Sequence, residues 1–492
     1  MTIRVGATAL ILIGLYACTA KDNDIFRETA ALQEKGELVK AETMIRAYLD
    51  SNPDLDPAVI RRLKFEIERG NRIRYDYSLT DSVLFRALQR SLTGVTWDEF
   101  SDWQKAGWFD SRVIDGEKRF VSPSVSNLLF RHPDTKKRLI KYDTYSNLAR
   151  VIEKHVRKLK ELAAGYPDPV LFPRKCRVNQ TITVKREAVP PGAQVRCWLP
   201  YPSVFDTQGD VRFISSGPEP RWLSPPGSPI RSLYLESTMP DSGDLSFGVT
   251  YEYTSYAFFQ PIDPERVEPF DGTEDIYRLY TREEYPHEIF SDEMRELADR
   301  IVGNEKNPYL KGKRIYDWIA DNIRYSYARE YSTLRNISAY CLSHKYGDCG
   351  QEAILFITLC RIAGLPARWQ SGFMTFPGDE GMHDWTEIYI RPYGWLPVDP
   401  YMGIFFTSMT EDLDPETRQD LRDFYYGNID HFRLVANKGH NLKLYPEKKD
   451  FRSETVDFQR GEVEWSGGNL YFDRWRWSID ITDLETVREH EH

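Results

Sequence analysis

A cysteine at the predicted start of a helix is the residue of this chain best suited to nucleophilic chemistry. Cys349 follows Gly347 and Asp348 and precedes a helix-like run over residues 351–361. The partial positive charge at a helix N-terminus favours a thiolate over a thiol, and the thiolate is the nucleophilic form. The sequence therefore predicts a reactive cysteine whose pKa lies below that of a free thiol.

A histidine and an aspartate follow Cys349 in an order that suits an activated nucleophile. His383 would take the thiol proton and later give it to the leaving group. Asp399 would bind the other ring nitrogen, fix the tautomer and stabilise the charged ring. We therefore predict a catalytic triad of Cys349, His383 and Asp399.

Each of these three residues also has a simpler structural interpretation. A lone cysteine is usually a small buried hydrophobe. His383 follows a loop-like stretch at 378–381, so it suits an exposed surface position as well. Asp399 precedes Pro400 and would serve as a turn former. The three residues together favour the catalytic interpretation.

A metal site is the chemical alternative for the same segment. Cys341 and His344, with Cys349, have side chains of the type that bind zinc. A fourth ligand at suitable spacing is missing, and the sequence contains no His-Glu-x-x-His motif. We therefore predict neither a metal nor another cofactor.

The composition indicates a folded acidic protein. Of its 492 residues, 41% are hydrophobic and 28% are charged, and the formal net charge is -10. This charge argues against nucleic acid or an anionic membrane surface as the main partner.

The first residues have the pattern of an export signal. Arg4 is followed by a short apolar run over 5–16, and Ala17 precedes Cys18. This ending resembles a bacterial lipobox, so we predict a signal peptide over 1–17 and lipidation of Cys18. The alternative is an ordinary cleaved signal with an incidental cysteine. The acidic stretch after Cys18 resembles the surface-export tag of Bacteroidetes lipoproteins, which would place the protein on the cell envelope, at the outer-membrane surface.

The cysteine count argues for a free thiol. The sequence has six cysteines, and use of Cys18 for lipid leaves an odd number. Cys349 and Cys360 are too far apart on one helix to form a disulfide. Cys341 could approach either of them, and Cys176 could pair with Cys197, so the sequence leaves disulfides open.

The hydrophobic periodicity divides the chain into regions of different character. We expect a helical N-terminal domain over 18–165, an antiparallel β-sandwich over 166–270, an α+β core over 271–435 and a C-terminal β hairpin extension over 436–492. The fold class is thus multidomain α+β. Within the first domain, a helix–Gly36–helix unit resembles a single tetratricopeptide-type hairpin, helices are expected to start near 80–82 and 96–99, and 136–162 reads as one basic helix.

Several motifs of the core resemble the transglutaminase-like superfamily. They are residues 346–350, 364–368, 383–387 and 395–400, with a leading helix over 315–325. The resemblance covers roughly 290–402 and implies a papain-like fold, with Cys349 as nucleophile, His383 as acid/base and Asp399 as orienter. It further implies that Trp385 lines the substrate cleft. The β module before the core is similar to the domain that often precedes such cores in bacteria.

The resemblance predicts an exported thiol enzyme that acts on peptide or side-chain amide bonds through a thioacyl intermediate. We expect a cysteine peptidase or amidase more than a cross-linking acyltransferase. The alternative is a catalytically silent binding module on the cell envelope. The expected partners are a peptide or protein substrate and, through the lipid anchor, the membrane, with no nucleic acid. The sequence leaves open the natural substrate, the oligomeric state and which of Tyr340, His344 or Tyr346 would complete the oxyanion hole beside the Cys349 N–H.

Overall fold

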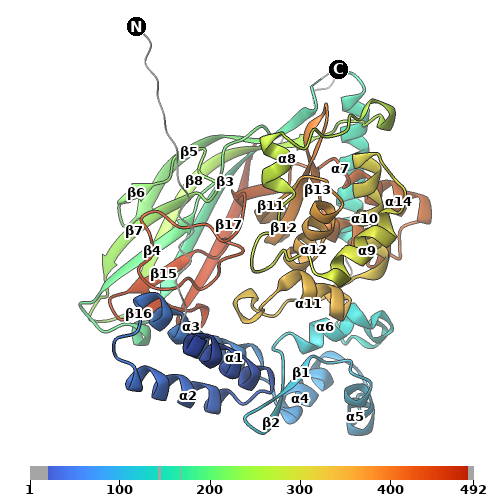
Figure 1. Cartoon of the computed structure of the whole chain (residues 1–492). Coiled ribbons are helices and arrows are strands. Elements are labelled where there is room, and N and C mark those ends of the chain that lie inside the picture. Colours follow the sequence, from blue (N-terminus) through green and yellow to red (C-terminus); the bar gives the residue numbers. More distant parts are fainter. Residues whose placement is uncertain (1–19, 142–145, 167, 486–492) are drawn as a thin grey trace. The chain divides into compact units, whose positions relative to one another are not determined.

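The structure, a computed structural model, describes residues 20–141, 146–166 and 168–485 and confirms the predicted mixture of helices and antiparallel sheets (Figure 1). The signal segment and Cys18 lie outside the described residues. No helix within the described ranges has both the length and the apolar character needed to cross a membrane. The predicted domain boundaries stay predictions.

The helices are α1 (Ala20–Glu34), α2 (Leu38–Ser51), α3 (Pro57–Asp76), α4 (Asp81–Ser91), α5 (Trp97–Lys105), α6 (Ser124–Arg131), α7 (Ser146–Ala163), α8 (Asp275–Tyr280), α9 (Asp292–Val302), α10 (Pro308–Asn322), α11 (Ile337–His344), α12 (Cys349–Ile362), α13 (Pro400–Ser408) and α14 (Pro415–Phe424). The strands are β1 (Ser111–Ile114), β2 (Glu117–Phe120), β3 (Val170–Val184), β4 (Gln194–Pro200), β5 (Gln208–Gly217), β6 (Trp222–Leu223), β7 (Ser232–Thr238), β8 (Leu245–Phe258), β9 (Arg324–Tyr325), β10 (Tyr346–Gly347), β11 (Ala367–Phe376), β12 (Asp379–Ile390), β13 (Gly394–Val398), β14 (Arg433–Asn437), β15 (Glu462–Trp465), β16 (Gly468–Leu470) and β17 (Trp475–Glu485).

One compact unit contains α1, α2 and α3 together with the hairpin β1–β2. Gly36 joins α1 to α2 with φ +77°, a conformation that favours glycine. A side chain there would also collide with the carbonyl oxygen of Val113 in β1. The helix–Gly–helix unit is therefore confirmed, and its turn packs against a hairpin that the sequence analysis did not predict.

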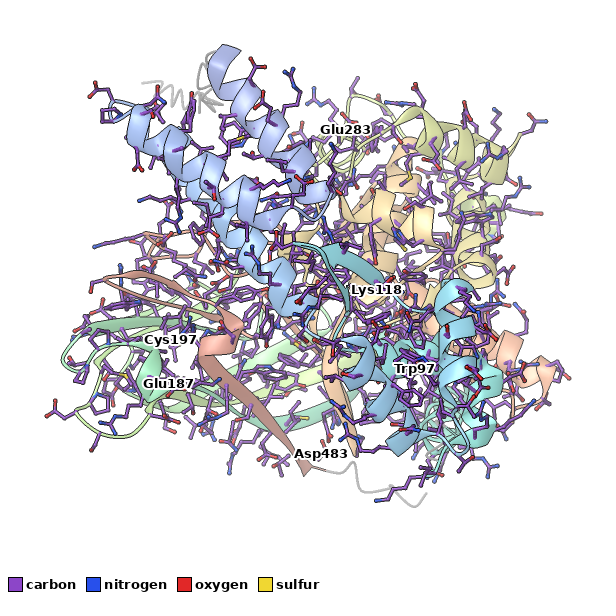
Figure 2. The ribbon with its side chains drawn as sticks, turned by 90° about the horizontal axis from the view of Figure 1, so that it is seen from below. Trp97, Lys118, Glu187, Cys197, Glu283 and Asp483 are labelled. Atoms are coloured by element: carbon purple, nitrogen blue, oxygen red, sulfur yellow. The ribbon has the colours of Figure 1, made fainter. Side chains whose placement is uncertain are left out.

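Two of the predicted helix starts in the N-terminal region are confirmed, and one predicted helix is wrong. Thr96 caps α5, which begins at Trp97 (labelled in Figure 2), and α4 begins at Asp81. The single helix expected over 136–162 is interrupted. Residues 133–138 form a short 3-10 turn, and the backbone of Leu139 and Ile140 then pairs with residues 91–92 instead of continuing as a helix.

Two antiparallel sheets form the predicted β-sandwich. One sheet has the order β17-β3-β8-β5 and the other the order β16-β15-β4-β7-β6. Alternate residues of β8, among them Phe247, Val249 and Tyr251, are buried in a core shared by the two sheets. These residues therefore share the face of the strand that is buried between the sheets.

The C-terminal extension belongs to both sheets of the sandwich. β15 and β16 pair as the predicted hairpin, but β15 also pairs with β4, and β17 pairs along β3. Figure 2 labels Cys197 on β4 and Asp483 near the end of β17. The aromatic residues Trp465, Trp475 and Trp477 pack on the sandwich core, so packing rather than cleft formation accounts for them.

The α+β core consists of the antiparallel sheet β13-β12-β11-β14 and the helix α12 (Figure 1). Every residue of α12 from Gly350 to Arg361 is buried, so this helix is central to the core. On β11, Gly372 lies opposite His383 of β12. A side chain at Gly372 would collide with the carbonyl oxygen of Leu434 in β14, so the glycine permits the close approach of β11 and β14.

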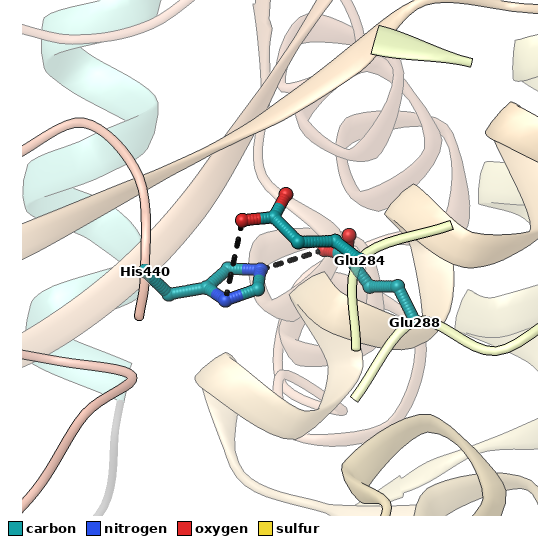
Figure 3. A group of neighbouring side chains, drawn as sticks. All are labelled: Glu284, Glu288 and His440. Carbon is teal, nitrogen blue, oxygen red and sulfur yellow. Dashed lines mark hydrogen bonds and ion pairs between the residues drawn. The ribbon is translucent and has the colours of Figure 1, made fainter. Parts of the chain in front are cut away.

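A buried ionic cluster holds the C-terminal end of α12. Arg361 pairs with Glu284 at 3.2 Å and with Glu288, and His440 Nε2 lies 3.0 Å from Glu288 Oε1 (Figure 3). Burial would raise the pKa of Glu288, but Arg361 and His440 hold it below its usual value. Burial would lower the pKa of His440, but Glu288 raises it above its usual value. The charges of the cluster therefore balance one another, and they connect α12 to the segments that contain Glu284 and Glu288 and that contain His440.

This cluster predicts a stability contribution that depends on pH. The raised pKa of His440 stabilises the fold below about pH 6.5, and this stability is lost as the pH rises through the folded-state pKa of His440. The lowered pKa of Glu288 stabilises the fold above about pH 4.5, and this stability is lost as the pH falls through the folded-state pKa of Glu288. His440→Gln should therefore lower the free energy of unfolding most between these values. Urea titrations at several pH values measure this, with the exposed His344→Gln as control. If His440→Gln lowered the free energy of unfolding by the same amount at every pH from 5 to 9, the role of the His440 charge would be contradicted.

Candidate active site

The first residue of α12 is Cys349, as the sequence predicted. Asp348 caps the helix, with its Oδ1 accepting from the Gln351 N–H at 3.0 Å, while Gln351 Oε1 accepts from the Asp348 N–H at 3.4 Å. This reciprocal capping box fixes the entry of the chain into α12. It places the Cys349 thiol at the positive end of the helix.

His383 and Asp399 are joined by a buried hydrogen bond. His383 Nε2 lies 2.8 Å from Asp399 Oδ2, and both side chains are almost fully buried. Asp399 follows β13 and caps α13, since its Oδ1 accepts from the Met402 N–H at 3.2 Å. Asp399 is thus a helix cap, as its position before a proline suggests, and also the partner of the imidazole.

Arg433 of β14 completes the surroundings of the aspartate. Its Nη1 donates to Asp399 Oδ2 at 2.8 Å, and its Nη2 donates to Asp430 Oδ2 at 2.9 Å. Burial would raise the pKa of Asp399, but His383 and Arg433 hold it below its usual value. Burial lowers the pKa of His383 despite the raising effect of Asp399. The pair is therefore an ionised aspartate and a neutral imidazole, whose Nε2 carries the proton and whose Nδ1 can accept one.

The nearest polar partner of the thiol is a carboxylate. Cys349 Sγ donates to Asp384 Oδ2 at 3.8 Å. A side chain at Gly350 would lie 2.7 Å from the same carboxylate oxygen, so the glycine makes room for Asp384. Asp384 follows His383 directly on β12, which places the thiol beside the histidine's own strand.

This environment opposes the thiolate that the sequence predicted. Burial raises the pKa of the Cys349 thiol, and the carboxylates of Asp384 and Asp348 raise it further. Burial also raises the pKa of Asp384 and brings the pKa of Asp348 to about 7. The expectation of a lowered thiol pKa is therefore wrong for this resting arrangement, because the effect of the helix N-terminus is outweighed by burial and neighbouring acids.

Several residues around the site gave no usable sequence signal. Gln459 donates from Nε2 to Asp384 Oδ1 at 2.7 Å and to the His383 carbonyl oxygen at 3.0 Å. Tyr331 donates to Asp348 Oδ1 at 2.7 Å. Gln459 and Arg433 are far from Cys349 in sequence and reach the site through the fold, so no local motif could have identified them.

The three residues proposed as oxyanion donors form a separate aromatic group. The Tyr340 and His344 rings stack with centroids 4.1 Å apart, and the Tyr346 and His344 centroids are 5.5 Å apart. His344 Nδ1 bonds to the Tyr340 carbonyl oxygen at 2.9 Å. Tyr331 lies against Gly350, the residue after Cys349, since a side chain on Gly350 would collide with its hydroxyl oxygen.

Trp385 lies beside the histidine, as the resemblance implied. Its ring stacks on His383 with centroids 5.7 Å apart and planes 23° apart. The side chain is buried and lines a cavity on the side of the sheet that faces the sandwich. The tryptophan therefore lies between the histidine and this cavity.

The cluster of Figure 3 is the group within the described residues whose ligand atoms are close enough to hold a metal ion. These residues are Glu284, Glu288 and His440, and they include neither Cys341 nor His344. Arg361 already occupies the position of the cation between the two carboxylates. The donor set is therefore satisfied by protein charges.

Comparison with known proteins confirms the resemblance of the core. Residues 295–400 match the model of the transglutaminase-like superfamily core. An uncharacterized protein of Haemophilus influenzae is 24% identical over 226 residues, or 38% of this chain and 58% of that protein. YebA of Bacillus subtilis is 24% identical over 151 residues, or 27% of this chain and 20% of that protein. The chain thus spans less than two thirds of each of these relatives.

Two solved structures are also similar to this chain. A structure described as a candidate cysteine protease from Cytophaga hutchinsonii has 18% identity and a TM-score of 0.41, and the match covers 64% of this chain and 93% of that one. The periplasmic domain of TgpA from Pseudomonas aeruginosa has 14% identity and a TM-score of 0.25, with coverage of 48% and 91%.

The contact between Cys349 and Asp384 predicts that a neutral side chain at 384 makes the thiol more reactive. Asp384→Asn keeps an oxygen that can accept from Gln459 but removes the ionisable carboxyl group beside Sγ, whose ionisation raises the pKa of the thiol. The apparent pKa of the thiol should fall, and alkylation should accelerate about threefold or more at the alkaline pH values at which the wild-type Asp384 is ionised, since each unit of pKa changes the thiolate fraction roughly tenfold. Iodoacetamide labelling from pH 6 to pH 9, read at Cys349 by mass spectrometry, measures the change.

Glu380→Gln is the matched control for this prediction, because Glu380 lies exposed on the same strand. It should leave the labelling profile unchanged. An unchanged or slower labelling rate in Asp384→Asn would show that the Asp384 charge does not suppress the thiol.

Proposed function

We propose that this protein is a cysteine-dependent enzyme that hydrolyses peptide or side-chain amide bonds, with Cys349 as nucleophile, His383 as acid and base, and Asp399 as the residue that orients the histidine. The observation that carries the proposal is the buried hydrogen bond between His383 Nε2 and Asp399 Oδ2. The residue that follows His383 on β12 is Asp384, and Asp384 contacts the Cys349 thiol. The match of residues 295–400 to the transglutaminase-like core supports the same assignment.

The proposed reaction begins from a neutral thiol and a neutral imidazole. As Sγ attacks the carbonyl carbon, His383 Nδ1 takes the thiol proton, and Asp399 stabilises the charged ring. Collapse of the tetrahedral intermediate breaks the C–N bond, and His383 returns the proton to the leaving amine. A water molecule, deprotonated by His383, then attacks the thioester and releases the acid and the free thiol.

We propose water rather than an amine as the acceptor of the acyl group. Water needs no dedicated binding site, whereas transfer requires an amine to reach the thioester before water does. Product analysis with and without an added primary amine separates the two reactions.

One observation favours a second candidate, a catalytically silent binding module. The thiol hydrogen-bonds to Asp384 rather than to His383, and its pKa is raised. In a silent module these three residues would have structural roles alone. In an enzyme, substrate binding must bring Sγ and Nδ1 together, as active-site hydrogen bonds often tighten in the complex.

Loss of the nucleophile tests the proposed enzyme directly. Cys349→Ala should abolish labelling by thiol-reactive peptide probes and reduce amide hydrolysis by about a thousandfold or more, because the covalent step is lost. His383→Asn and Asp399→Asn should also be strongly impaired. A peptide-library screen read by mass spectrometry measures labelling and substrate class together.

Cys341→Ala is the matched control, since Cys341 is a buried free cysteine on α11 and has no proposed role. Hydrolysis that persists in folded Cys349→Ala would rule out the triad. Wild-type protein that binds the peptides without modification or turnover would favour the binding module.

We propose that the protein is exported and anchored to the cell envelope by lipid on Cys18. The support is the sequence alone: Arg4, the short apolar run and the alanine before Cys18. Wild-type protein should incorporate palmitate and show globomycin-sensitive processing, and Cys18→Ala should lose both. Processing without lipid incorporation in the wild type would instead indicate an ordinary cleaved signal.

A further inference from the structure

A cavity of about 660 Å³ lies between the core sheet and the β-sandwich. One wall comes from β11, β12 and β13, and the other comes from the segment around Phe205 and from β8. Its size is within the range of small-ligand sites in proteins. Neither Cys349 nor His383 lines it, so the cavity is distinct from the reacting atoms.

Three residues of the lining, Arg368, Lys438 and Glu387, which we call the floor of the cavity, have more positive than negative charge. Arg368 Nε donates to Glu387 Oε2 at 2.6 Å, and Lys438 Nζ lies 3.8 Å from the same oxygen. Burial would raise the pKa of Glu387, but Lys438 and Arg368 hold it below its usual value, so the carboxylate is ionised. One carboxylate therefore faces two cations.

Of the two cations, Lys438 has fewer hydrogen-bond partners. Its ammonium donates no hydrogen bond within the described residues, although its side chain is only 18% exposed. Burial and the neighbouring Arg368 lower the pKa of Lys438, in spite of the raising effects of Glu387 and Asp206. An anion placed beside Nζ would relieve this electrostatic cost.

Aromatic rings surround these charges. The Lys438 ammonium lies 3.8 Å from the centroid of the Phe205 ring, and the Arg368 guanidinium lies 3.8 Å from that of Trp395. Trp385 and Tyr389 line the same cavity. Such walls suit an apolar or aromatic group, and the two cations suit its charged end.

The cavity is also connected to the proposed catalytic pair. Arg433 lines it and donates to Asp399, and Trp385 lines it and stacks on His383. A ligand in the cavity would therefore contact side chains that orient the histidine.

We propose that this cavity binds a carboxylate attached to an aromatic or aliphatic body, with Lys438 and Arg368 as its anion partners and the aromatic walls as the contact for its body. The cavity is also lined by Asp430, whose charge is paired with Arg433, and by Asp168 and Asp206, which are exposed, so that water screens their charges more than those of the buried floor. A free peptide C-terminus and a small organic acid share this chemistry.

Calorimetry on the full chain with Cys349→Ala tests the site without interference from turnover, so failure here is distinguishable from failure of the proposed hydrolase. The probes are N-acetylphenylalanine and its uncharged amide. The acid should bind at least about tenfold more tightly than the amide, because a charge-assisted hydrogen bond is lost in the amide. Equal binding of acid and amide, or binding of neither, would overturn the proposal.

Two further variants locate the binding. Lys438→Met should weaken binding of the acid about tenfold, whereas Lys443→Met, at an exposed lysine paired with Glu447, should not. Asp206→Asn should tighten binding, since it removes one of the two carboxylates, Glu387 and Asp206, that act on Lys438. Wild-type affinity in folded Lys438→Met would overturn the proposed floor.

Two peptides of the same sequence ending in phenylalanine distinguish a peptide C-terminus from a small organic acid as the source of the carboxylate. One has a free C-terminus and the other is amidated. Tighter binding of the free-ended peptide than of N-acetylphenylalanine would identify a peptide C-terminus as the ligand. Tighter binding of N-acetylphenylalanine would identify a small organic acid.

Discussion

The rest of the site depends on the hydrogen bonds that the Asp399 carboxylate accepts. One oxygen caps α13, and the other accepts from both His383 and Arg433. A single buried charge thus joins the end of β13, the histidine of β12 and the arginine of β14. Because two donors hold it, the aspartate stays ionised despite burial, and the imidazole keeps a defined tautomer. Removing the charge would leave Arg433 with Asp430 as its remaining anion and free the histidine ring.

The acidic surroundings of Cys349 give the site its resting state. Asp348, Asp384 and Glu352 are buried near the start of α12, and burial together with mutual repulsion raises the pKa of each carboxyl. A helix N-terminus contributes a partial charge of about half a unit, which is too little to hold a thiolate against several buried acids. In the proposed enzyme the thiol is therefore activated by His383 as attack occurs, rather than being ionised beforehand. This arrangement would limit reaction with adventitious electrophiles.

The sequence predicted those parts of the molecule that local patterns specify. The helix that starts at Cys349 and the helix start near 96–99 were both predicted, because both depend on neighbours within a few residues. The pairing of β15 and β17 with β4 and β3 was not predicted, since strand pairing across almost the whole chain leaves no local signal. The same reason explains why Arg433 and Gln459 were missed. The pKa of Cys349 was predicted with the wrong sign because its burial and the approach of Asp384 are tertiary effects.

The central claim is that Cys349 carries the acyl group during turnover. Acid quenching of the full chain within milliseconds of mixing with a peptide thioester, followed by intact-mass measurement and peptide mapping, tests it most directly. The account predicts a mass increase equal to the acyl group, mapped to Cys349, that decays with release of the free acid and is stabilised in Asp399→Asn. Release of the acid with no acyl group on Cys349, or with the group on another residue, would contradict it.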